Sequence, residues 1–166
     1  MGVDIKITTD DLYFRYRTGA FLIHDNKMLL VHTNYGSYYY MIGGAVNILE
    51  TTEHCVLREV FEETGLNAKV ERLGVIVENF FRGFGGVLEG KDCHTLEFYY
   101  ILSVDSIEGM KTTTDDGEPL CWIPLDEIKN TNIKPSFVTE KFDEILSSDH
   151  VIHYVEERDR NNTTPY

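Results

Sequence analysis

Residues 44–66 read GAVNILETTEHCVLREVFEETGL, and this stretch determines how the rest of the chain is interpreted. Its apolar residues recur at spacings of one, three and four, which is the pattern of one helical face. They are Val56, Leu57, Val60 and Phe61. Thr51 is a suitable N-cap for such a helix, and Gly65 can end it in a left-handed conformation. The pattern therefore predicts a helix from about Thr51 to Thr64.

The opposite face of this predicted helix carries three carboxylates, Glu59, Glu62 and Glu63. At spacings of three and four residues they are lateral neighbours that repel one another. Arg58 is the one cation in their sequence neighbourhood, and it cannot neutralise all three. A hard divalent metal can, because Mg²⁺ binds carboxylate oxygens together with substrate phosphates. The alternative interpretation is a solvated acidic helix face.

The whole stretch also resembles a known family motif, the Nudix box. With U for an aliphatic residue, the box reads G-x5-E-x7-R-E-U-x-E-E-x-G-U, and a chance match is expected in on the order of 10⁻⁷ of chains this long. The matching positions are Gly44, Glu50, Arg58, Glu59, Val60, Glu62, Glu63, Gly65 and Leu66. The chain is thus similar to MutT-like Nudix hydrolases. The resemblance implies an α/β fold, an α/β/α sandwich around a mixed β-sheet.

The resemblance also implies an activity, the hydrolysis of a pyrophosphate bond in a nucleoside diphosphate derivative. Such substrates include nucleoside triphosphates, oxidised nucleotides and sugar nucleotides such as ADP-ribose. The implied cofactor is Mg²⁺, with Mn²⁺ as a substitute. By position in the box, Glu59 and Glu63 become the principal metal ligands, Glu62 an additional ligand, and the Gly44 carbonyl a further one. Glu50 and Arg58 match positions that form an orienting ion pair.

The general base is not identified by the box, because it often lies elsewhere in the chain. Glu62 is one candidate, and Glu97 on a predicted strand is another. Three acids in a later loop are further candidates: Asp115, Asp116 and Glu118. The alternatives are that Glu97 is an exposed strand residue and that the loop acids are only solvated.

The remainder of the chain reads as strands with one further helix. Aromatic and branched residues predict strands at Tyr13–Ile23, Met28–His32, Tyr38–Ile42 and Leu120–Ile123, and a long hairpin of Lys69–Phe81 with His94–Val104. Ser136–Ser147 has the spacing of an amphipathic helix. The glycine-rich connection 82–92 is a hairpin tip or a lid. No linker composition appears, so we expect one domain over residues 1–155 and a polar tail at 156–166.

Composition excludes several classes of function. Lys and Arg number 15 against 28 Asp and Glu, a net charge of −13, which disfavours binding to nucleic acid or anionic membranes. No apolar run reaches transmembrane length, and no signal peptide is recognised. Three cysteines without a C-x-x-C pair predict a reducing, cytoplasmic location. There is no P-loop, no complete zinc ligand set and no covalent nucleophile motif.

The box does not specify which side chains contact the substrate. Two aromatic groups, Tyr38–Tyr40 and Phe80, Phe81 and Phe84, can stack on a base, although core packing or a dimer contact is the commoner use. Arg15 and Arg17 alternate on the first long strand, where they either face phosphates or form cross-strand ion pairs. The resemblance allows a homodimer.

The chain departs from the family pattern at three positions that the box does not require. Ile42 stands where members usually carry Pro, and Asn47 and Leu49 stand where many have Glu and Gly. These departures leave the subfamily and the nucleotide substrate open. A second hypothesis is a non-catalytic nucleotide sensor on the same scaffold, and its sign would be a missing glutamate among Glu59, Glu62 and Glu63. None is missing. A third is an acidic structural domain without a site.

Overall fold

The computed structural model describes residues 2–34, 36–83 and 85–157. Over these residues the chain forms an eight-stranded mixed sheet in the order β4-β3-β2-β6-β5-β8, with β1 paired to β2 and β7 paired to β3. The strands are β1 Lys6–Thr8, β2 Leu12–His24, β3 Lys27–His32, β4 Tyr39–Tyr40, β5 Lys69–Arg82, β6 Asp92–Ser103, β7 Leu120–Pro124 and β8 Ile152–Glu156. The helices are α1 Thr52–Thr64 and α2 Phe137–Ser147, with short 3₁₀ turns η1 Gly86–Leu88 and η2 Leu125–Asn130.

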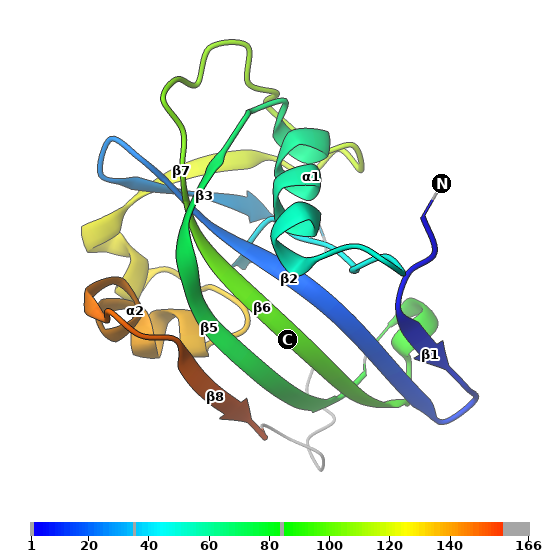
Figure 1. Cartoon of the computed structure of the whole chain (residues 1–166). Coiled ribbons are helices and arrows are strands. Elements are labelled where there is room, and N and C mark those ends of the chain that lie inside the picture. Colours follow the sequence, from blue (N-terminus) through cyan, green and yellow to red (C-terminus); the bar gives the residue numbers. More distant parts are fainter. Residues whose placement is uncertain (1, 35, 84, 158–166) are drawn as a thin grey trace.

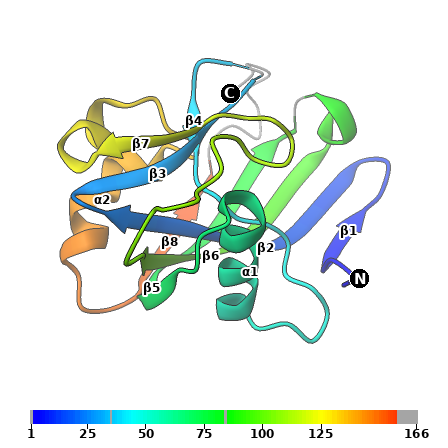
Figure 2. The same cartoon turned by 90° about the horizontal axis from the view of Figure 1, so that it is seen from above.

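The two α-helices pack on opposite faces of the sheet. Successive strand residues point to opposite faces, and β2 shows both: Leu22 packs in a core cluster with Val56 and Val60 of α1, whereas Phe21 packs in a second cluster with Phe137 of α2. Figure 1 shows α1 in front of the long strands. In the view from above, Figure 2 shows α1 and α2 well separated from each other. The α/β/α sandwich with a mixed sheet is confirmed.

Helix α1 has the predicted ends. The Thr51 side chain accepts a hydrogen bond from the His54 backbone N–H at 3.2 Å, and Gly65 closes the helix at φ 76°. One assignment within the helix is wrong: Phe61 is 53% exposed. The buried residues of α1 are Cys55, Val56, Val60 and Thr64, so Phe61 lies at the edge of the apolar face rather than on it.

The predicted hairpin is confirmed, since β5 and β6 pair antiparallel from Lys69 opposite Ser103 to Arg82 opposite Asp92. Glu156, the first residue of the predicted tail, is buried and ends β8, which pairs with β5. Residues 158–166 lie outside the described part. No helix in the described ranges is long and apolar enough to cross a membrane, and Cys55, Cys93 and Cys121 are free.

The predicted strand Tyr38–Ile42 is shorter than expected, because its second half pairs with a different neighbour. β3 is registered with β2 only at Ile23 and His24. Nearer the start of β2, the segment 42–46 replaces β3 as its neighbour. The Ala20 N–H donates to the Ile42 carbonyl at 2.8 Å, and the Thr18 N–H donates to the Gly44 carbonyl at 2.9 Å. This replacement brings the Gly-Gly pair beside β2.

An ion pair then ties the loop after Gly44 to α1. Arg58 donates from Nε to Glu50 Oε1 at 2.8 Å and from Nη2 to Glu50 Oε2 at 3.0 Å. The Asn47 backbone N–H also donates to Glu50 Oε2 at 3.0 Å. The Arg58 hydrogen bonds lower the pKa of Glu50 to about 2, and the Asn47 bonds assist, although burial opposes the shift. The loop therefore has one anchored position relative to the helix.

Replacing Glu50 with Gln should lower the free energy of unfolding near pH 7 by about 1–3 kcal/mol, because a bidentate charge-assisted contact becomes a neutral one. A carboxyl group whose folded pKa lies below its ordinary 4.5 contributes stability that is present above that pH and lost as the pH falls towards 2. Urea denaturation at several pH values should therefore show a wild-type advantage that shrinks in acid.

Glu53→Gln is the matched control, since Glu53 is an exposed acid in the first turn of the same helix. It should shift the unfolding free energy by less than about 0.5 kcal/mol. A stability difference for Glu50→Gln that stays constant from neutral to acid pH would contradict the ion-pair explanation.

Candidate active site

A cavity of about 330 Å³ lies beside α1, where the segment 42–46 departs from β3 to pair with β2. Four carboxylates line it: Glu59, Glu63, Asp116 and Glu118. Two cations of β2, Arg15 and Arg17, line it as well, together with Gly43, Gly44, Tyr40 and Thr114. The cavity thus has both acidic and basic residues in its wall, as a site for a metal-bound anion requires.

Glu59 lies directly against the backbone of Gly44. A Cβ atom on residue 44 would fall 2.1 Å from the carboxyl carbon of Glu59, so only glycine leaves room for this carboxylate. The Gly44 carbonyl, an expected metal ligand, accepts a hydrogen bond from the Thr18 N–H at 2.9 Å. The same carbonyl oxygen also lies 3.9 Å from the Cys55 thiol, a weak donor that lies closer to the Ala45 carbonyl, at 3.3 Å.

Glu63 is the carboxylate most affected by its neighbours. Burial raises its pKa, and the negative charges of Asp115, Glu59 and Asp116 raise it further, while a hydrogen bond of 3.2 Å from the Asp115 N–H partly opposes them. The raised pKa thus reflects burial first and the neighbouring negative charges second. A bound divalent ion would reverse that effect.

Glu62 behaves differently from the other two helix carboxylates. Its side chain is 51% exposed and accepts a hydrogen bond from Arg58 Nη1 at 3.0 Å. The same Arg58 nitrogen contacts Glu59 Oε1 at 2.7 Å. The structure therefore brings Glu59 and Glu63 to the cavity and leaves Glu62 on the outer side of α1, paired with Arg58.

The donor chemistry fits a hard divalent cation. Carboxylate oxygens are the ligands that Mg²⁺ prefers, and Gly44 leaves space for one of them. Among the described residues, however, no three His, Cys, Asp or Glu side chains are already gathered as a metal-binding group. Since Glu59 is held by Arg58, assembling such a group requires side-chain rotation.

Glu118 is a fixed part of the cavity wall. It is 8% exposed and accepts hydrogen bonds from the Asn34 backbone N–H at 3.1 Å and from the Tyr40 hydroxyl. Burial raises the pKa of Tyr40, and the bond to Glu118 raises it further, so Tyr40 stays a donor. The solvated alternative is thus wrong for Glu118, whereas Asp115 and Asp116 are exposed.

The environment of Glu97 differs from what the sequence suggested. It is 3% exposed, not an exposed strand residue, and it is absent from the described residues that line the cavity. Its carboxylate accepts hydrogen bonds from Asn79 Nδ2 at 3.3 Å and from the hydroxyls of Thr95 and Tyr99. A general base needs access to the water that it deprotonates, and the surroundings of Glu97 do not provide it.

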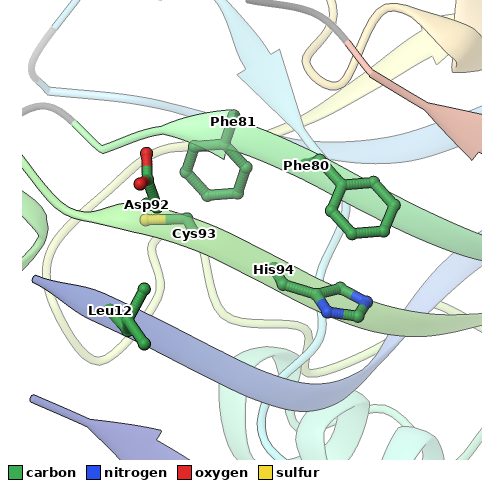
Figure 3. A pocket seen from close by; sticks show the side chains of 6 residues that line it. All are labelled: Leu12, Phe80, Phe81, Asp92, Cys93 and His94. Carbon is green, nitrogen blue, oxygen red and sulfur yellow. The ribbon is translucent and has the colours of Figure 1, made fainter. Parts of the chain in front are cut away.

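The aromatic residues divide between two places. Tyr40 lines the first cavity, whereas Phe80 and Phe81 line a second cavity of about 300 Å³ (Figure 3). In this second cavity Phe80 stacks on His94 with 4.3 Å between ring centroids, and among the described residues the two cavities share no lining residue. Phe84 lies outside the described residues. Sequence reasoning missed Thr114, for which the only signal is a run of three threonines.

The chain is similar to known proteins over most of its length. The NUDIX domain family matches residues 13–142. A MutT-like protein from Streptomyces ambofaciens is 24% identical over 123 residues, which cover 74% of this chain and 71% of that protein.

Solved structures share the fold. The mutator MutT protein from Bacillus halodurans superposes with a TM-score of 0.61 at 20% identity, covering 85% of this chain and 90% of that one. An ADP-ribose pyrophosphatase from Streptococcus suis superposes with a TM-score of 0.59 at 17% identity, covering 86% and 98%. Because the family match spans most of the sequence and includes the complete box, this chain belongs to the Nudix family of hydrolases, enzymes that act on pyrophosphate bonds in nucleotide derivatives.

Proposed function

We propose that the cavity beside α1 is the active site of a Mg²⁺-dependent pyrophosphohydrolase, with Mn²⁺ as a substitute metal. The observation that carries the proposal is the placement of Glu59 and Glu63 in one cavity with Asp116, Glu118 and two arginines. The alternative is a sensor that binds a nucleotide on the same scaffold without turnover.

Glu59 and Glu63 would hold a divalent cation at this site, and it would supply the charge that activates water and stabilises phosphate oxygens. The protein's own residues position the groups. Gly44 lets Glu59 approach the loop, and Glu50 with Arg58 anchors that loop. Glu118 is held by Tyr40 and Asn34, which suits it better than Glu97 to orient an attacking water.

The substrate is a nucleoside diphosphate joined to another group. Structural relatives include a protein named as a MutT protein and another named as an ADP-ribose pyrophosphatase, and we propose the same broad class here. The decisive experiment incubates the purified protein with nucleoside triphosphates, oxidised nucleotides, ADP-ribose and dinucleoside polyphosphates, with Mg²⁺, with Mn²⁺ and with chelator.

Chromatography of the products separates the two hypotheses. Chelator-sensitive release of a nucleoside monophosphate supports the hydrolase, and the second product identifies the cleaved bond. A nucleotide that raises the melting temperature without being cleaved supports the sensor instead.

We also propose a reducing compartment such as the cytoplasm, supported by three free cysteines of which Cys55 and Cys93 are buried. A homodimer stays a prediction, and the molar mass in solution from light scattering tests it.

Replacing Glu63 or Glu59 with Gln should each lower kcat/KM by about a hundredfold or more, because each change removes a charged oxygen ligand from the cavity. Glu62→Gln should cost less than about tenfold, since Glu62 lies outside the cavity and pairs with Arg58. Steady-state kinetics at saturating Mg²⁺ measures all three variants, with Glu53→Gln as the control on the same helix. A Glu62 variant as impaired as Glu63→Gln would contradict this division of roles.

Replacing Gly44 with Ala should lower activity by about a hundredfold with little loss of stability. The added Cβ would displace the Glu59 carboxylate, which is the movable end of a side chain and not part of the backbone. Gly74→Ala is the matched control, because a Cβ there has no neighbour nearer than 3.5 Å. Kinetics and thermal denaturation are compared for both variants. A Gly44→Ala protein with undiminished turnover would show that the close approach of Glu59 to residue 44 is not needed for activity.

A further inference from the structure

Arg17 and Glu97 face each other on adjacent strands. β2 and β6 run parallel, and their register places Arg17 opposite Glu97 and Gly19 opposite Tyr99. Alternation along the strands puts Arg17, Glu97, Phe21 and Tyr99 on the face away from α1, where Phe21 and Tyr99 belong to the core cluster of α2. Of the pair, only Arg17 reaches the cavity wall.

The Glu97 carboxylate is held in one orientation. Asn79, Thr95 and Tyr99 each donate a hydrogen bond to it, and they come from both β5 and β6. Three donors on this buried side chain fix its position opposite Arg17. This explains why an acid is buried on a strand that lies outside the proposed reaction centre.

The Arg17 guanidinium, in contrast, is not saturated. Its Nε is buried and has no hydrogen-bond partner among the described residues. Burial lowers the pKa of Arg17, but Glu97, Tyr99, Tyr13 and Glu59 together offset this, so the net pKa is raised. A charged guanidinium with unused donors at a cavity wall indicates that its partner is a ligand.

The cavity offers an anionic ligand few cationic partners. Four carboxylates line it, and Arg15 and Arg17 are the cations among its described lining residues. A pyrophosphate adds further negative charge to a chain that already carries a net −13. Guanidinium groups bind phosphate oxygens with paired N–H donors.

We propose that Arg17 binds a non-bridging phosphate oxygen of the substrate and that Glu97 is its positioning residue. Glu97 acts through Arg17 and takes no proton from water. The inference rests on the proposed function, because it identifies the residue that holds the substrate's pyrophosphate.

The test measures binding of methylenediphosphonate, a pyrophosphate analogue that cannot be hydrolysed, by calorimetry in the presence of Mg²⁺. Arg17→Met should raise the dissociation constant by about ten- to a hundredfold, and Arg17→Lys should restore part of the loss. Glu97→Gln should raise it by about three- to tenfold, and the double variant should bind no more weakly than Arg17→Met, since Glu97 acts through Arg17. Arg82→Met is the control, because Arg82 pairs with Asp92 on the same sheet outside the cavity.

Steady-state kinetics and thermal denaturation complete the test. We expect Glu97→Gln to raise KM with kcat nearly unchanged. A collapse of kcat with unchanged binding would make Glu97 a general base and overturn the inference, as would additive losses in the double variant. Unchanged binding with a lowered melting temperature would assign a structural role only and overturn it too, and so would a wild type that does not bind the analogue. Arg17-dependent binding by a wild type that cleaves no nucleotide would refute the proposed function alone.

Discussion

The backbone pairing between β2 and the segment 42–46 is the constraint on which the rest of the site depends. A Cβ on Gly43 would lie 2.0 Å from the Thr18 carbonyl oxygen, so the two backbones approach as closely as glycine allows. This approach places Gly44 beside Glu59 and starts the loop that Glu50 and Arg58 anchor. It also separates β3 from residues 16–20 of β2. The cavity lies at that separation.

Charges of opposite sign reach the cavity from different elements. Helix α1 contributes Glu59 and Glu63, the loop before β7 contributes Asp116 and Glu118, and β2 contributes the arginines. Because the acids come from two separate segments, a cation bound between them would also join those segments. Under the proposed function, the two arginines of β2 are the groups left to bind the anionic substrate.

The elements that could be predicted from the sequence are those with a strong local pattern. Helix α1 and the β5–β6 hairpin carry period-3.6 and strand-like patterns with glycine at their ends, and both formed where expected. The predictions failed where pairing with residues far away in the chain decides the length of a strand or the burial of a side chain. β4 is shortened because residues 42–46 pair with β2, and β8 exists because the chain adds to β5. Glu97 is buried because donors from two strands surround it.

By itself, the sequence determined the family, helix α1 and the carboxylates on it, because these depend on spacings within one short segment. It also determined the acidic character of the chain. Only the tertiary structure decided which of the carboxylates share a cavity, that Glu62 pairs with Arg58 instead, and that Glu118 is buried while Asp116 is exposed. The physical reason is that burial and charge pairing depend on residues far apart in the chain, and sheet pairing brings those residues together.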